Sequence, residues 1–166
     1  MEDITQLATT LGQRLQALGA TVTTAESCTG GGIAEAITRV AGSSGWFEAG
    51  YVTYSNRQKH LQLQVPEVLF GQVGAVSEEV VLAMATGAAR RAEARFAVAV
   101  SGVAGPGGGS ADKPVGTVWL AWADGDSTFA HRCQFDGDRH AVRQQTVVAA
   151  LHGLVALATG EKPGRG

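Results

Sequence analysis

The pattern of apolar and polar positions divides the first part of the chain into alternating helical and extended segments. Apolar residues recur at helical spacing over residues 4–18, which predicts an amphipathic helix. A short apolar run over 20–25 predicts a strand, and 33–40 predicts a second helix. The aromatic and β-branched stretch 47–54 predicts another strand, which a short helix over 55–63 follows.

The central part of the chain predicts a connection, a helix, a strand and a long loop. Residues 66–74 are interpreted as connecting structure. Ser77 is the predicted N-cap of an amphipathic helix that ends near Arg91. The nearly continuous apolar run 96–101 is typical of a strand buried on both faces, and a glycine-rich loop over 102–114 follows it.

The last part of the chain predicts a β-hairpin and a final helix. Strands are expected over 115–123 and 127–135, with a turn at Asp124-Gly125-Asp126 between them. The final helix is expected to start within 136–138 and to run to about Ala158. Alternating helices and strands followed by a hairpin indicate a layered α/β domain with a mixed sheet.

Composition and charge narrow the classes of function. The 166 residues fit one domain, and 45% hydrophobic with 17% charged residues is ordinary for a globular protein with a core. A net charge of -2 argues against a general nucleic-acid binder. The start of the chain shows no secretory signal, and no apolar run is long enough to span a membrane, so a cytoplasmic protein is expected. Cys28 and Cys133 form neither a metal-ligand spacing nor a disulfide framework.

The stretch TTAESCTGGG, residues 23–32, places two nucleophile-capable side chains directly before three glycines. Glycines let a ligand approach the backbone, and a helix that begins there directs free N–H groups at the loop. Ser27 would then lie where these amides could stabilise an oxyanion. Alternatively, Ser27 or Thr29 is only an N-cap and the glycines form a tight turn. Cys28 is either a competing nucleophile or a small packed residue.

A serine nucleophile needs a base, and lysine is a better candidate here than histidine. None of the four histidines lies in a comparable loop or has an obvious carboxylate partner in the sequence: His60, His131, His140 and His152. A buried lysine can supply a neutral amine. Tyr54 at a strand end and Lys59 shortly after it could converge on one site, or they could be a core-edge tyrosine and a surface lysine.

Two further features suit a ligand. The loop SGVAGPGGGSADKP, residues 101–114, follows a buried strand at the edge where α/β sheets bind ligands, although it lacks the ending of a phosphate-binding P-loop. Arg139 and Arg143 share a face at the start of the last helix, where cations oppose the helix dipole. They indicate either an anionic ligand or pairing with acids such as Asp136 and Asp138.

Taken together, these motifs resemble the CinA C-terminal domain family and, within it, its stand-alone nicotinamide-nucleotide amidases. The matching blocks stand in the family's order and cover nearly the whole chain: TVTTAESCTGG, AGSSGWFEAGYVTYSN followed by Lys59, GAVSE, SGVAGPGGGS, KPVGTVW and FDGDRHAVR. The resemblance implies a three-layer α/β/α sandwich with a mixed, mostly parallel sheet of about five strands. It also implies a homodimer.

The resemblance further implies hydrolysis of nicotinamide mononucleotide to nicotinate mononucleotide and ammonia, a step of pyridine-nucleotide recycling. Motif matching assigns catalysis to Ser27 as nucleophile with Lys59 and Tyr54, and assigns the substrate phosphate to Arg139. The remaining substrate-binding residues are expected in the two glycine-rich segments: Cys28, Thr29, Gly30, Gly31, Ser101, Gly102 and Gly105.

The domain is expected to span residues 1–160, with a flexible tail over 161–166. The expected reaction needs no cofactor and no metal, and neither nucleic acid nor membrane is an expected partner. The alternative function is a non-catalytic nucleotide-binding module with a regulatory role in competence or DNA damage, because the glycine loop and the arginine pair suit binding alone.

Overall fold

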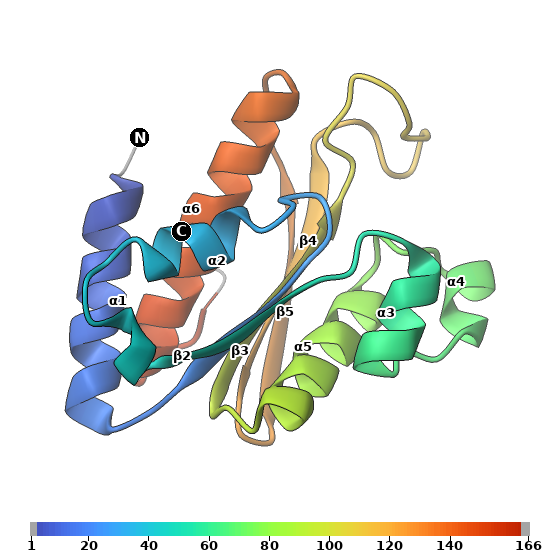
Figure 1. Ribbon diagram of the computed structural model, residues 1–166. Helices are drawn as coiled ribbons and strands as arrows, with labels where there is room; N and C mark the ends of the chain where they lie inside the picture. The colour runs from blue at the N-terminus through green and yellow to red at the C-terminus, as the bar shows by residue number, and fades with distance from the viewer. Residues whose placement is uncertain (1–2, 164–166) are drawn as a thin grey trace.

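Five strands form one mixed sheet in the computed structural model, which describes residues 3–163 (Figure 1). The strand order is β2-β1-β3-β4-β5. β1 pairs in parallel with β2 and β3, whereas the β3–β4 and β4–β5 pairs are antiparallel, so only β4 opposes the common direction. This confirms the expected mixed, mostly parallel sheet. The strands are β1 (Val22–Glu26), β2 (Phe47–Val52), β3 (Phe96–Gly102), β4 (Thr117–Asp124) and β5 (Ser127–Gln134).

Helices cover both faces of the sheet, which confirms the three-layer α/β/α arrangement (Figure 1). One face carries α1 (Ile4–Leu18), α2 (Gly32–Thr38) and α6 (Arg139–Ala158), with a short 3-10 turn η1 (Ser43–Gly45) before β2. The other face carries α3 (Asn56–Leu63), α4 (Val68–Gln72) and α5 (Glu78–Ala92).

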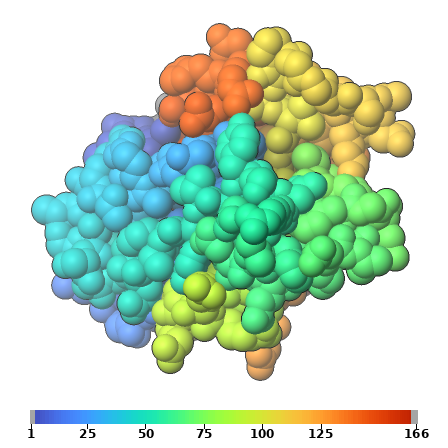
Figure 2. Space-filling model, turned by 45° about the vertical axis from the view of Figure 1, so that its right-hand side comes forward, coloured from blue at the N-terminus to red at the C-terminus, as the bar shows by residue number. Residues whose placement is uncertain are grey.

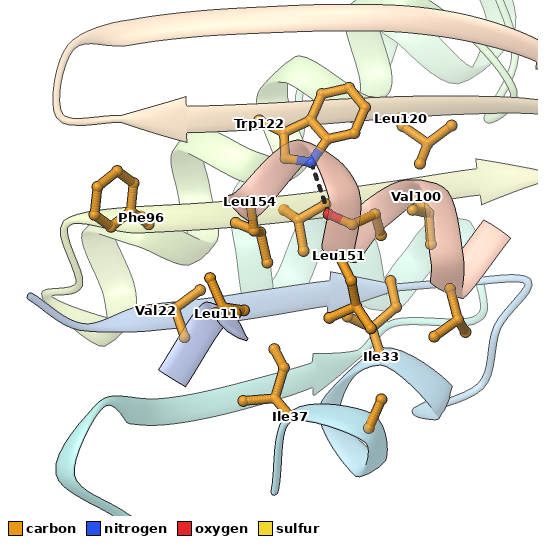
Figure 3. Packing of buried hydrophobic residues seen from close by; sticks show 14 of the residues in the cluster. Leu11, Val22, Ile33, Ile37, Phe96, Val100, Leu120, Trp122, Leu151 and Leu154 are labelled. Carbon is orange, nitrogen blue, oxygen red and sulfur yellow. Dashed lines mark hydrogen bonds between the residues drawn. The ribbon is translucent and has the colours of Figure 1, made fainter. Parts of the chain in front are cut away.

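Because side chains alternate along a strand, β3 contributes large apolar residues to one face of the sheet and alanines to the other. In β3, Phe96, Val98 and Val100 pack on the α1–α2–α6 side, whereas Ala97 and Ala99 face α5. Trp122 packs on the face with the large residues: its indole donates to the Ala150 carbonyl at 3.0 Å, as the dashed line in Figure 3 shows. The small alanine surface lets α5 lie close to the sheet.

Several element boundaries differ from the prediction for local reasons. The predicted connection 66–74 contains α4, a helix too short to produce a periodic signal. β1 extends to Glu26 because parallel neighbours on both sides continue the ladder past the apolar run. The hairpin turn narrows to Gly125-Asp126, with Gly125 at φ 58 in the left-handed region.

Residues 161–163 follow α6, and residues 164–166 of the predicted flexible tail lie outside the described residues. None of the helices described between residues 3 and 163 has the length and apolar character needed to cross a bilayer.

Candidate active site

Ser27 lies at the carboxyl end of β1, between the ends of two parallel neighbours. Glu26 is opposite Val52 of β2 and Val100 of β3, so the residues after these strands meet at one edge of the sheet. Ser101, the next residue of β3, is therefore adjacent to Ser27, and its side chain is buried. This edge is where open α/β sheets place ligands.

The turn that carries Ser27 depends on its glycines. Gly30 and Gly31 adopt φ values of 59 and 103, which favour glycine. The Gly30 amide donates to the Ser27 carbonyl at 3.0 Å and closes the turn. Ser27 itself is only 8% exposed. The glycine turn is thus confirmed, and one of the amides expected to face a ligand is already used within it.

Glu26 is a buried site residue that the sequence analysis did not single out. Its carboxylate accepts from the Ile33 and Ala34 amides at 2.8 and 2.9 Å and from the Thr29 hydroxyl at 2.5 Å. The expected free amides at the start of α2 are therefore occupied by this side chain, which corrects that prediction. The available signal was an acid placed just before a helix, where the helix dipole favours negative charge.

Lys59 reaches Ser27 from α3. Ser55 caps this helix, accepting from the Gln58 amide, and the turn that follows directs Lys59 inward. Its Nζ lies 3.0 Å from Ser27 Oγ and donates to the Tyr54 carbonyl oxygen at 3.0 Å. The side chain is 1% exposed, and this burial lowers the pKa of Lys59 from 10.5 to about 8. A buried amine of this kind can act as a neutral base.

The two polar ends of Tyr54 have different partners. Its carbonyl oxygen lies at the Ser27–Lys59 contact, 3.4 Å from Ser27 Oγ. Its hydroxyl accepts from Arg139 at 2.9 Å, and the residue is 58% exposed. Tyr54 therefore lies at the site, as predicted from the sequence, but its backbone carbonyl, rather than its phenol, contacts Lys59.

Cys28 is packed rather than open. It is 5% exposed, and burial raises the pKa of its thiol to about 11, against the opposing charges of Lys59 and Arg143. A thiol in this state is a poor nucleophile at neutral pH. Thr29 is 1% exposed and its hydroxyl is directed to Glu26, so only its backbone is left to face a ligand.

The two arginines of α6 each contact a different glycine-rich segment. Arg139 donates to the Gly105 carbonyl at 2.8 Å, and Arg143 donates to the Thr29 carbonyl at 3.1 Å. Among residues 3–163, the ion pairs do not include either arginine, and Asp138 instead caps α6 by accepting from the Ala141 amide. The alternative in which these arginines pair with Asp136 or Asp138 is therefore wrong.

Two glycines at the end of β3 and in the loop that follows it allow close packing against the segment 115–118. A Cβ on Gly102 would lie 2.6 Å from a Val118 methyl, and one on Gly105 would lie 2.4 Å from a Val115 methyl. This loop and the start of α6 border a cavity of about 460 Å³ whose lining includes Pro106 and Arg139. Figure 2 shows the yellow loop and the orange helix side by side on the surface.

His140 also lines the cavity beside Arg139, whereas His60 lies elsewhere on the surface. His60 has a carboxylate partner that the sequence did not reveal: its Nε2 lies 2.9 Å from Glu67 Oε1, at a separate cavity between α3 and α4. Within the described residues, His, Cys, Asp and Glu side chains do not gather in groups that could hold a metal ion.

Comparisons with known proteins identify the family. The chain is 73% identical to nicotinamide-nucleotide amidohydrolase PncC of Pseudomonas putida over 159 residues, which is 96% of this chain and 99% of that protein. It is 54% identical to the PncC protein of Escherichia coli K12 over 92% of this chain and 93% of that protein.

Solved structures of CinA-related proteins share the fold of this chain. The competence/damage inducible protein CihA of Agrobacterium tumefaciens has a TM-score of 0.92 at 46% identity, covering 95% of this chain and 96% of that one. A CinA superfamily protein of Klebsiella pneumoniae has a TM-score of 0.92 at 38% identity, covering 96% and 99%. The profile of the CinA C-terminal domain matches residues 4–158. This chain belongs to the CinA C-terminal domain family.

Proposed function

We propose that this protein hydrolyses the carboxamide of nicotinamide mononucleotide to nicotinate mononucleotide and ammonia, as a step of pyridine-nucleotide recycling. The observation that carries the proposal is the buried 3.0 Å contact between Ser27 Oγ and Lys59 Nζ. The names and high identities of the PncC relatives support the choice of substrate. A cytoplasmic location is part of the proposal, and so is the homodimer that the family resemblance implies.

In the first half of the reaction, neutral Lys59 Nζ takes the proton of Ser27 as Oγ bonds to the carboxamide carbon. The carbonyl electron pair moves to oxygen. The carbon–nitrogen bond then breaks, and the lysine ammonium returns its proton to the leaving nitrogen, which departs as ammonia. In the second half, Lys59 deprotonates a water that attacks the acyl-enzyme, and Ser27 recovers its proton.

Backbone groups orient this chemistry. The Tyr54 carbonyl accepts from Lys59 Nζ and so directs the lone pair of the neutral amine at Ser27. Because the Gly30 amide is bound to the Ser27 carbonyl, we assign the oxyanion to the amides of Cys28 and Thr29.

Arg139 is the proposed phosphate ligand. Its contacts, the Gly105 carbonyl and the Tyr54 hydroxyl, are both neutral, so its positive charge remains available to an anion. It also lines the cavity of about 460 Å³ beside the glycine loop. Phosphate binding here would orient the nucleotide without touching the reacting carbon.

The test is ammonia release from nicotinamide mononucleotide by wild type, Ser27→Ala and Cys28→Ala. We expect Ser27→Ala to abolish turnover with an unchanged circular dichroism spectrum, and Cys28→Ala to stay active. Activity in Ser27→Ala combined with loss in Cys28→Ala would transfer the nucleophile role to the thiol. Arg139→Ala is expected mainly to raise KM, and an unchanged KM would remove the phosphate assignment.

The second candidate is a regulatory nucleotide-binding module, which the references to competence and damage in the names of the structural neighbours favour. It requires binding without turnover. Calorimetric binding of the mononucleotide by a folded wild type that releases no ammonia would favour this function over the amidase.

A further inference from the structure

Two charged side chains from different elements hold Thr29. Its hydroxyl donates to Glu26 Oε1, and its carbonyl oxygen accepts from an Arg143 terminal nitrogen at 3.1 Å. Glu26 belongs to β1 and Arg143 to α6, so two separate elements meet on the turn that carries Ser27.

Arg143 lies against the turn rather than extending into solvent. Its Nε is buried, and within residues 3–163 it has no hydrogen-bond partner. A Cβ placed on Gly30 would lie 3.1 Å from the same terminal nitrogen that binds Thr29, so the absence of a side chain at Gly30 leaves room for this contact. Burying Nε without a partner costs free energy, which the hydrogen bond from the terminal nitrogen to the Thr29 carbonyl partly offsets.

Glu26 holds the other side of the turn. Its carboxylate is fully buried and accepts from the Thr29 hydroxyl and from the Ile33 and Ala34 amides in the first turn of α2. Since Glu26 directly precedes Ser27, these contacts hold the chain immediately beside the nucleophile. Removing one partner of such a set leaves the others unsatisfied.

We propose that Glu26 and Arg143 are positioning residues that hold the Ser27 turn through Thr29 and so keep Ser27 Oγ directed at Lys59. The catalytic consequence rests on the proposed amidase function. The proposal separates the two arginines of α6: Arg139 would bind ligand, whereas Arg143 would hold the turn. Misplacing a nucleophile by about 1 Å can cost on the order of 100-fold in rate.

The test compares Arg143→Met and Arg143→Lys with Arg14→Met, a matched change on the exposed side of α1. We expect Arg143→Met to lower kcat by on the order of 10- to 100-fold with little change in KM, because substrate contacts stay intact. Arg143→Lys should recover part of the loss, since an ammonium can still donate to the Thr29 carbonyl. Hydrogen exchange of the 27–32 amides should accelerate in Arg143→Met and stay at the wild-type rate in Arg14→Met.

Glu26→Gln tests the other side of the turn and should show the same loss of kcat. If that variant does not fold, Thr29→Val removes the same hydroxyl contact from the other partner and should show the loss instead. Unchanged kcat in Arg143→Met, or a rise in KM alone with unchanged exchange, would overturn the proposal.

A separate readout distinguishes failure of this proposal from failure of the amidase function. The rate at which an aryl sulfonyl fluoride labels Ser27 reports the reactivity of the hydroxyl without the nucleotide substrate. If wild type releases no ammonia, the amidase proposal fails, and labelling then decides the positioning role. Slower labelling with faster 27–32 exchange in Arg143→Met supports that role, and unchanged labelling refutes it.

Discussion

Lys59 Nζ lies 3.0 Å from Ser27 Oγ, although the two residues are 32 positions apart in the sequence. Ser27 is placed by the end of β1, and Lys59 is placed by α3, which packs on α5. The contact therefore depends on tertiary packing between elements, and both its chemistry and its energetic cost can be tested by substitution.

Lys59→Met should stabilise the folded protein and lower its activity. Burial lowers the pKa of Lys59 from 10.5 to about 8. Below pH 8 the folded protein therefore carries a buried ammonium, which lowers its free energy of unfolding. We expect Lys59→Met to raise the free energy of unfolding at pH 7 by about 1–3 kcal/mol and to lower kcat by about 100- to 10,000-fold. Urea denaturation and ammonia assays measure the two effects.

The stability gain has a defined pH dependence. Between about pH 8 and 10.5 the unfolded chain binds the Lys59 proton and the folded protein does not, so the cost disappears as pH rises through this window. The difference between Lys59→Met and wild type should shrink accordingly. Lys162→Met, a change at an exposed position, is the control. A destabilised Lys59→Met at pH 7 would contradict the buried-ammonium account.

The pH–rate profile should report the same lysine. Because the proposed base is the neutral amine, kcat/KM should increase about tenfold per pH unit below neutrality and level off above the Lys59 pKa of about 8. Stopped ammonia assays across this range, with circular dichroism at each pH to verify folding, provide the measurement. A profile that is flat or falls with pH would exclude neutral Lys59 as the base.

Tyr54→Phe should affect binding more than chemistry. The substitution keeps the carbonyl that contacts Lys59 and removes only the hydroxyl that accepts from Arg139. Loss of one exposed hydrogen bond worth about 1 kcal/mol predicts a KM about threefold to tenfold higher with nearly unchanged kcat. Steady-state kinetics with nicotinamide mononucleotide measure kcat and KM of the variant. A collapse of kcat at constant KM would instead establish the phenol as a proton relay.

Gly87→Ala should displace Lys59 by shifting α3, the helix that carries it. A Cβ at this position of α5 would lie 2.0 Å from the Leu63 carbonyl oxygen at the end of α3, so the helix that carries Lys59 must shift. We expect a loss of about 1–3 kcal/mol in unfolding free energy together with reduced kcat. Gly71→Ala in α4, where the space is open, is the matched helical control and should be neutral or slightly stabilising. Equal behaviour of the two variants would exclude this packing role for Gly87.

Most elements could be predicted because their signals are local. The nearly continuous apolar run 96–101 and the Ser77 cap each predicted an element close to its observed position. The helix α4 and the last residue of β1 were missed, since a five-residue helix has no period to detect and Glu26 is extended by its parallel neighbours.

The sequence by itself determined the α/β class, the glycine turn after Ser27 and the motifs that indicate the family, because turn chemistry and periodicity act over a few residues. Only the tertiary structure decided the relations between segments. It placed the Tyr54 carbonyl, instead of its phenol, beside Lys59, directed Glu26 to the first amides of α2, and assigned the two arginines of α6 to different loops. These contacts join distant segments, so they depend on how the layers pack, which no local pattern encodes.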